Sequence, residues 1–391
     1  MDFGTCARLM ADFRFSTVAT IVSELSASTR LSEIITSSLA SPVARPMIVT
    51  DQGLIAAGVI APIIEGLQSS GFTVSIFDGV VADPPEHVIH RAVEVAKSQN
   101  ADCIIGLGGG SSMDCAKLVA LLAKTLQSLN EIYGIGHARG PRLPLIQIPT
   151  TAGTGSEVTP ISIVTTGETT KMGVVSPVLY ADVAVLDGLL TLSVPAPVTA
   201  ATGIDAMVHA IEAITSRHLK NPYSDMLAME SLGRIAAHLL RCVRDGQDAE
   251  ARQAVLYGAM LAGQAFANAP VGGVHALAYP LGGIYHLPHG LSNALMLLPV
   301  LRFNQAAAHD DYTRIAKTLG HNDIDTLLDW LTKFMGDLNV PLGLRRHGIS
   351  HNQLPELADA AMLQTRLLGN NPRPISHADA LALYEEAWEA A

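Results

Sequence analysis

Short apolar runs and longer stretches of helical periodicity alternate through the first half of the chain. Apolar runs of four or five residues, such as PMIVT, predict buried strands. These runs lie at residues 46–50, 73–77, 102–106, 145–148 and 182–186. Helical patterns, as over residues 55–70 and 86–98, separate the first four runs. This alternation favours a parallel sheet with crossover helices, and residues 161–175 predict extra strands or a hairpin.

The pattern changes near residues 191–197, within the proline-rich stretch TLSVPAPV. Beyond it, Ala, Leu and Met recur at helical spacing, and helices are predicted over residues 200–216, 222–242 and 249–268. We therefore predict two domains. An α/β domain with a parallel, Rossmann-like sheet covers residues 1–193, and an all-α domain covers residues 194–391.

Composition narrows the class of protein. The chain of 391 residues is 49% hydrophobic and 16% charged, with a net charge of −11 and no basic run, so nucleic acid and anionic membranes are poor partners. No apolar run is long enough to predict a membrane helix, and the N-terminus does not resemble a secretory signal. The four cysteines (Cys6, Cys103, Cys115 and Cys242) form no Cys-x-x-Cys pair. A reducing cytoplasm is the expected location.

A glycine-rich turn follows the predicted strand at residues 102–106. Gly108, Gly109 and Gly110 let the backbone approach a ligand closely, and Ser111 can cap the helix that follows. Free N–H groups at a helix N-terminus would bind an anion such as a pyrophosphate. The segment matches neither the Walker motif nor G-x-G-x-x-G, whose third glycine is missing. A tight structural turn is the alternative interpretation.

Two further segments favour a nucleotide site at the same edge of the sheet. The loop PTTAGTGSEVTP at residues 149–160 follows a predicted strand and carries Thr150, Thr151 and Thr154. Ligands bind at the carboxyl ends of parallel strands, although loops rich in Ser and Thr are common. Asp51 ends the first predicted strand, where an acid can hold the ribose hydroxyls of an adenine dinucleotide and repel a 2′-phosphate. Helix capping is the alternative role for Asp51.

Histidines gather in VHALAYPLGGIYHLPHG, residues 274–290. On one straight helix, His275 and His289 would lie roughly 21 Å apart. Pro280, Gly282 and Gly283 allow a reversal, with a new helix from about residue 288, and this would bring the two imidazoles together. Buried histidines that serve only structure are common, so a shared site is permitted but not required.

An earlier helix, GIDAMVHAIEAIT at residues 203–215, supplies a second pair of candidate ligands. Asp205 and His209 are four residues apart and so share one helix face. Such a pair can simply form a hydrogen bond. In combination with His275 and His289, it would provide one carboxylate and three imidazoles, which suits Fe²⁺ or Zn²⁺.

Four of these segments together resemble the iron-containing (group III) alcohol dehydrogenases. They are GGGSSMDCAK, PTTAGTGSEVT, GIDAMVHAIEA and HALAYPLGG…PHG, in this order and at these intervals. The resemblance covers about residues 12–388. It implies a dehydroquinate synthase-like fold, an NAD(P) site and a divalent metal in a cleft between the two domains, and a homodimer or larger homo-oligomer.

The resemblance also implies roles for individual residues. Asp205, His209, His275 and His289 would bind the metal. Asp51 would favour NAD over NADP, and Lys171 would lie on a strand that borders the cofactor. The remaining implied cofactor-binding residues are Gly108, Gly109, Gly110, Ser111, Asp114, Thr150, Thr151 and Thr154.

The chain departs from the family pattern at two places. Relatives often carry a second histidine four residues after the third metal ligand, where this chain has Tyr279. Tyr279 should still face the site and, with His275, is predicted to act on the substrate. The N-terminal segment IVSELSAS lacks the glycine turn that is usual in relatives. His286 has no ligand role in the family and is expected to support a ligand or to form part of the pocket wall, with a purely structural role as the alternative.

The implied activity is reversible hydride transfer between a metal-bound alcohol, or an aldehyde or ketone, and nicotinamide. Two related alternatives are a maleylacetate reductase-type reductase of oxo-acids and a glycerol-type polyol dehydrogenase. A dehydroquinate synthase-like enzyme would need several Lys and Arg around its substrate, which the metal segments lack. A non-enzymatic module that binds a nucleotide or stores a metal would not require both a dinucleotide site and a metal site, which argues against this alternative.

Overall fold

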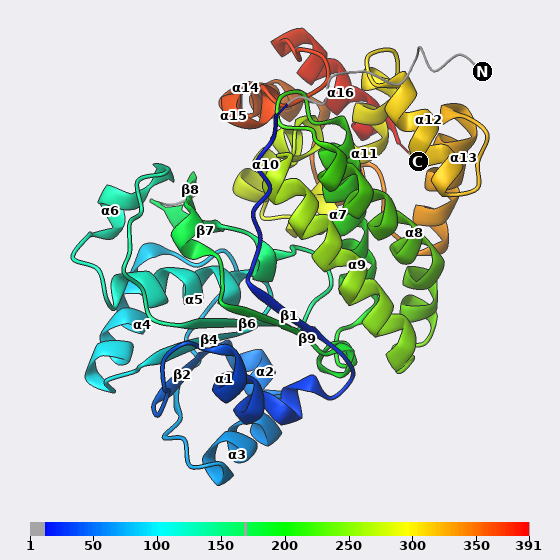
Figure 1. Cartoon of the computed structure of the whole chain (residues 1–391). Coiled ribbons are helices and arrows are strands. Elements are labelled where there is room, and N and C mark those ends of the chain that lie inside the picture. The colour runs from blue at the N-terminus through cyan, green and yellow to red at the C-terminus, as the bar shows by residue number, and fades with distance from the viewer. Residues whose placement is uncertain (1–11, 168–169, 391) are drawn as a thin grey trace.

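The computed structural model describes residues 12–167 and 170–390, and it has an α/β half and a helical half. In Figure 1 the sheet and its flanking helices occupy the lower left, and the helices from α7 onward form the upper right. The predicted boundary at residue 193 falls between the short helix η4 (Gly188–Thr191) and α7 (Ala196–Thr215). Residues 1–11 of the first predicted domain, which include Cys6, lie outside the described residues. Residue 391 of the second predicted domain lies outside them as well.

A parallel sheet of six strands organises the α/β half, with the order β1-β9-β6-β4-β2-β3. The five predicted strands are confirmed as β2, β3, β4, β6 and β9. Four of these are buried along their whole length, because helices cover both faces of the sheet. The strands are β1 (Thr20–Ser23), β2 (Pro46–Val49), β3 (Ser75–Phe77), β4 (Cys103–Gly108), β6 (Leu145–Pro149) and β9 (Val183–Leu186).

The edge strand β1 was not predicted. It is short and half-exposed, and it pairs with β9 from Thr20 opposite Val183 to Ser23 opposite Leu186. An edge strand needs no continuous apolar run, so its hydrophobic signal is weak. The predicted hairpin at residues 161–175 is confirmed: β7 (Ile161–Thr166) and β8 (Thr170–Val175) pair antiparallel, with residues 168–169 outside the described part.

Two helices of the α/β half were predicted by range, and the one over residues 86–98 is confirmed as α4. The predicted helix over residues 55–70 is two helices, α2 (Gln52–Ala56) and α3 (Ala61–Ser69). Gly58, with φ of 71°, breaks the helix between them. The other elements are η1 (Ala27–Arg30), α1 (Leu31–Ser38), α4 (Glu86–Ser98), α5 (Gly110–Leu122), α6 (Leu129–Ile132), β5 (Gly134–Ile135), η2 (Ser156–Val158) and η3 (Pro177–Leu179).

The helical half packs around one large apolar core. The three long helices predicted from periodicity are confirmed as α7, α8 (Pro222–Arg244) and α9 (Ala249–Asn268). No helix in the described ranges is long and apolar enough to span a bilayer. The later elements are α10 (Gly273–Tyr285), α11 (His289–Asn304), α12 (His309–Thr318), α13 (Ile324–Asp337), η5 (Leu344–His347), η6 (His351–Gln353), α14 (Leu354–Met362), α15 (Thr365–Leu368) and α16 (His377–Glu389).

The reversal predicted within residues 274–290 is confirmed, but its position differs. The glycines expected to form the turn lie inside α10, and the chain turns at His286, whose φ is 55°. At Gly282 a Cβ would make an ordinary van der Waals contact, 3.6 Å from the carbonyl oxygen of Leu287, so packing alone does not require glycine there. His286 is exposed at the end of α10, and its place in the pocket wall stays a prediction.

Candidate active site and metal centre

A cleft of about 890 Å³ opens at the carboxyl edge of the sheet. Its walls come from the loops that follow β2, β3, β4 and β6 and from the start of α7. The lining includes Asp51 and six residues of the two predicted cofactor loops: Gly109, Gly110, Ser111, Ser112, Thr150 and Thr151. The sequence segments predicted to bind a dinucleotide therefore meet at one cavity.

The glycine-rich turn is packed too closely for larger side chains. A Cβ on Gly108 would lie 2.6 Å from Oγ of Ser112, and one on Gly110 would lie 2.9 Å from Cγ2 of Thr154. Gly109 is the N-cap of α5 and offers no side chain to bond the first N–H groups of that helix. These backbone donors are therefore available to an anion in the cleft.

Asp51 has one of the two roles considered for it, that of a helix cap, and its ribose-binding role stays a prediction. Its Oδ1 accepts a hydrogen bond at 3.1 Å from the backbone N–H of Leu54 and so caps α2. The half-buried side chain also lines the cleft. A carboxylate that caps a helix through one oxygen keeps the lone pairs of the other oxygen for ribose hydroxyls.

The loop after β6 connects this cleft to the helical half. Thr150 and Thr151 line the cleft, whereas Gly153 packs against α7, where a Cβ would lie 2.8 Å from Cβ of Thr202. Thr202 precedes Asp205 by less than one helical turn. The loop therefore lines the cofactor cleft at its start and packs, three residues later, against the helix that carries Asp205.

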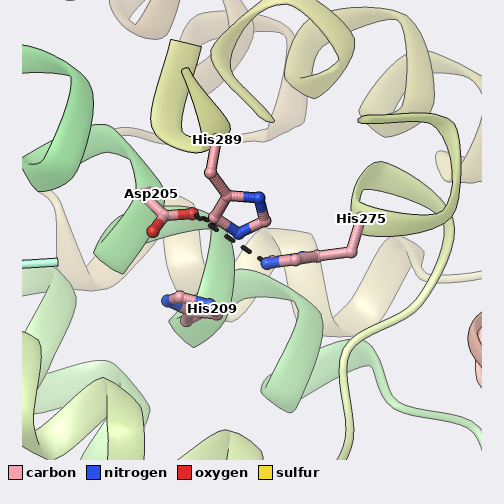
Figure 2. Close-up of side chains that lie close together, drawn as sticks. All are labelled: Asp205, His209, His275 and His289. Carbon is pink, nitrogen blue, oxygen red and sulfur yellow. Dashed lines mark ion pairs between the residues drawn. The ribbon is translucent and has the colours of Figure 1, made fainter. Parts of the chain in front are cut away.

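Asp205, His209, His275 and His289 come together from three helices, as Figure 2 shows. One donor atom from each of the four lies within 4.8 Å of the other three. Asp205 and His209 lie on α7, and His275 and His289 lie on α10 and α11. The reversal at His286 brings the last two together. His209 Nδ1 is buried without a hydrogen-bond partner among the described residues. This donor set fits a divalent transition metal.

Two side chains that the sequence interpretation missed hold these ligands in place. Oε2 of Glu212 lies 2.6 Å from Nδ1 of His275, and its Oε1 accepts a hydrogen bond from the backbone N–H of Val274 at 2.7 Å. Nδ2 of Asn293 donates to Oδ1 of Asp205 at 2.6 Å and lies 3.2 Å from Nε2 of both His275 and His289.

A signal for each of these two residues is present in the sequence. Glu212 is an acid within the otherwise apolar run that carries Asp205 and His209. Asn293 follows His289 by four residues and therefore shares its helix face. A polar side chain buried at either position needs a hydrogen-bond partner, and the ligands of a metal centre can provide one.

Burial keeps two of the imidazoles of the cluster, those of His209 and His289, neutral. It lowers the pKa of His209 to about 3, against an opposing effect of Asp205, and it lowers the pKa of His289 as well. A metal ligand must be deprotonated, so neutral imidazoles beside a carboxylate can bind a cation without first losing protons near neutral pH.

Two aromatic side chains border the cluster. Phe266 stacks on the ring of His209, with centroids 4.3 Å apart. Tyr279 lies one turn after His275 on α10, and its ring centroid is 6.0 Å from that of His289. Burial raises the pKa of Tyr279, so its phenol keeps its proton and can donate a hydrogen bond.

The remaining predicted cofactor residues lie outside the cleft lining. Asp114 accepts hydrogen bonds from Oγ of Ser156 at 2.5 Å and from the backbone N–H of Ile163 at 2.8 Å. The ammonium of Lys117 lies 3.4 Å from the same carboxylate. Lys171 pairs with Asp83 at 2.8 Å, and its Nζ would lie 4.0 Å from a Cβ on Gly282. Lys171 is thus placed where β8 faces α10.

Comparison with known proteins agrees with this geometry. The family model described as "Iron-containing alcohol dehydrogenase" matches residues 19–188, and that described as "Fe-containing alcohol dehydrogenase family, C-terminal" matches residues 199–388. The chain belongs to the iron-containing alcohol dehydrogenase family. Members of this family are oxidoreductases that act on CH–OH groups with NAD and a divalent metal.

Individual members of the iron-containing alcohol dehydrogenase family show how far the likeness extends. "Long-chain-alcohol dehydrogenase 1" of Geobacillus thermodenitrificans is 40% identical, over 88% of this chain and 89% of its own. The crystal structure of a 1,3-propanediol oxidoreductase has a TM-score of 0.92 at 33% identity, covering 96% of this chain and all of its own. Sulfoacetaldehyde reductase from Bifidobacterium kashiwanohense in complex with NAD⁺ has a TM-score of 0.90 at 27% identity, covering 97% of this chain and all of its own.

Proposed function

We propose that this chain oxidises an alcohol, or reduces the corresponding aldehyde or ketone, with NAD in the cleft and Fe²⁺ or Zn²⁺ held by Asp205, His209, His275 and His289. The observation that carries the proposal is the convergence of one carboxylate and three imidazoles from three helices. A divalent cation in this position supplies a Lewis acid that favours ionisation of an alcohol, and NAD supplies the hydride acceptor.

The protein side chains position these groups and control protons. Glu212 holds His275 so that Nε2 faces the cluster. Tyr279 is proposed to donate a hydrogen bond to the substrate oxygen, which fits its high pKa and its place beside His289. Phe266 and Tyr279 give the pocket apolar walls, which favour an alcohol over a multiply charged acid.

The cofactor is proposed to lie with its pyrophosphate at the N-terminus of α5, where Gly109, Gly110 and Ser111 line the cleft. Asp51 is proposed to hold the adenosine ribose and to favour NAD over NADP. Thr150 and Thr151 line the same cleft. For Gly108, Asp114, Thr154 and Lys171, whose contacts are mainly with the protein itself, a cofactor role remains a prediction from the family resemblance.

We also propose a domain boundary, a location in the cell and an oligomeric state for the enzyme. The domain boundary is placed at residue 193, between the regions that the two family models match. A cytoplasmic location is supported by Cys103, Cys115 and Cys242, which are buried free thiols. A homodimer or larger homo-oligomer is proposed from the family resemblance, and one surface for it is the edge of β1, which pairs only with β9 among the described residues.

A metal-resolved assay tests the proposal. Protein purified without air is stripped with a chelator, and NADH formation is followed with a panel of alcohols, polyols and hydroxy acids before and after Fe²⁺ or Zn²⁺ is restored. We expect activity to disappear with the metal and to return on its addition, and Asp205→Ala and His275→Ala to remain inactive in both conditions. Metal content measured on each variant shows whether the ligands are lost.

The two related activities are distinguished by the same panel. Full activity of the stripped protein towards an oxo-acid would contradict the metal-dependent proposal and favour a maleylacetate reductase-type enzyme. A strong preference for glycerol over simple alcohols would favour a polyol dehydrogenase within the same chemistry.

A further inference from the structure

The end of the cleft at which we place the adenosine ribose contains a basic side chain with no assigned role. Arg91 projects from α4 and lines the cleft together with Asp51 and Asp78. Its side chain is exposed, and within residues 12–167 and 170–390 no carboxylate lies within ion-pair distance of it. The guanidinium is therefore free to bind a ligand group of opposite charge.

The end of β3 determines where this guanidinium lies. The Cζ atom of Arg91 is 5.8 Å from the centroid of the Phe77 ring, at the last residue of the strand. At Gly79, a Cβ would lie 3.0 Å from Cζ of Phe77 and 3.5 Å from Nη2 of Arg91. The absence of a side chain at residue 79 leaves room for the Arg91 side chain beside Phe77.

The same glycine brings Arg91 close to the proposed ribose site. Gly79 and Asp51 form an antiparallel β-bridge, in which directly opposed Cα atoms lie about 5 Å apart. Nη2 of Arg91 and the backbone of Asp51 are therefore both close to Gly79, and both residues line the cleft. A ribose held by Asp51 would have its 2′ position in this region.

We propose that Arg91 binds the 2′-phosphate of NADP, so that this chain accepts NADP as a second and weaker cofactor. A planar guanidinium is well suited to a phosphate, which can accept two parallel hydrogen bonds from it. Asp51 and Asp78 repel a 2′-phosphate, whereas the ribose hydroxyls of NAD are neutral. NAD therefore remains the better ligand, and Arg91 determines how large the difference is.

This inference rests on the proposed function, because it requires a dinucleotide whose adenosine lies at Asp51. It is tested by measuring the affinities of NADH and NADPH from nicotinamide fluorescence, on the full chain stripped of metal. The variants are Arg91→Gln and, as a matched control, Lys97→Gln, which removes one positive charge from the exposed face of the same helix outside the cleft. The two cofactors differ only in the 2′-phosphate.

We expect Arg91→Gln to weaken NADPH binding by about tenfold. NADH binding should change by less than about twofold, and Lys97→Gln should affect neither cofactor by more than that. Equal effects of Arg91→Gln on NADH and NADPH, or an effect on neither, would overturn the inference and leave the proposed function intact. Failure of the unmodified chain to bind either cofactor would overturn both.

Discussion

Glu212 holds His275 through a contact of 2.6 Å between its Oε2 and Nδ1 of the imidazole. Because a carboxylate accepts hydrogen bonds, the proton of this contact lies on Nδ1, and Nε2 keeps the lone pair that a metal needs. The second oxygen of Glu212 is held by the backbone of Val274, so the carboxylate cannot rotate freely. His275 is therefore fixed in both tautomer and orientation before a metal binds.

We expect Glu212→Gln to lower metal affinity by about 10- to 100-fold, because the amide can turn its NH₂ group towards Nδ1 and no longer fixes the tautomer. The measurement is a chelator competition with Zn²⁺ on the full chain. Glu230→Gln, an exposed change on α8, is the matched control. An unchanged dissociation constant for Glu212→Gln would show that the contact serves packing alone.

Asp51→Asn should shift cofactor preference towards NADP. Asparagine can still cap α2, since its side-chain oxygen also accepts from the N–H of Leu54, but the negative charge in the cleft is lost. We expect NADPH binding to strengthen by about tenfold and thermal stability to change little. If Arg91 is the phosphate ligand, adding Arg91→Gln should remove most of this gain. A gain that persists in the double variant would indicate that Asp51 acts without Arg91.

Tyr279→Phe separates hydrogen-bond donation from general-base catalysis. Burial raises the pKa of Tyr279, so the phenol is protonated over the physiological range and cannot act as a base there. We expect kcat/KM to fall by roughly three- to tenfold, the value of one hydrogen bond. The shape of the pH profile between pH 6 and 9 and the metal content should remain unchanged.

The control for Tyr279→Phe is Tyr285→Phe on the same helix. The hydroxyl of Tyr285 is buried without a partner among the described residues, so its removal costs no hydrogen bond. If Tyr279→Phe instead removes the alkaline limb of the profile, the tyrosine exchanges a proton with the substrate.

Much of the fold follows from local sequence signals. Strands such as β4 are apolar along their whole length because helices cover both of their faces, and α9 begins and ends where its periodicity does. The two-helix structure of residues 52–69 was not predicted, because one glycine interrupts a continuous helical pattern. The strand β1 was missed for a different reason: its pairing with β9 depends on a contact across about 160 residues of sequence, which no local pattern records.

In the metal cluster, too, the features that depend on local sequence were predicted and those that depend on contacts between distant residues were not. The spacing of Asp205 and His209 predicts a shared helix face, and the breaks before His289 predict the reversal that brings it back to His275. The supporting contacts of Glu212 and Asn293 join residues on different helices. Because side-chain partners across helices depend on packing, these two residues could be identified as unusual in the sequence but could not be assigned to particular ligands.

Glu157 gives a prediction for the dependence of stability on pH. It is buried in η2, near the end of the loop that follows β6, and burial raises its pKa from 4.5 to about 7, against the opposing effect of Lys117. Between these two values the folded state holds a proton that the unfolded state has lost. The free energy of unfolding therefore falls as the pH rises from about 4.5 to about 7, and it stays lower above that range.

Glu157→Gln should remove this dependence, because glutamine does not ionise. We expect the variant to be more stable than the unmodified chain at pH 8, by up to about 3 kcal/mol, and the difference to be small at pH 5. Urea unfolding at the two pH values measures it, with Glu230→Gln as the control for loss of an exposed charge. A variant that is destabilised equally at both values would contradict the prediction, because it would show that the pKa of Glu157 is not raised in the folded protein.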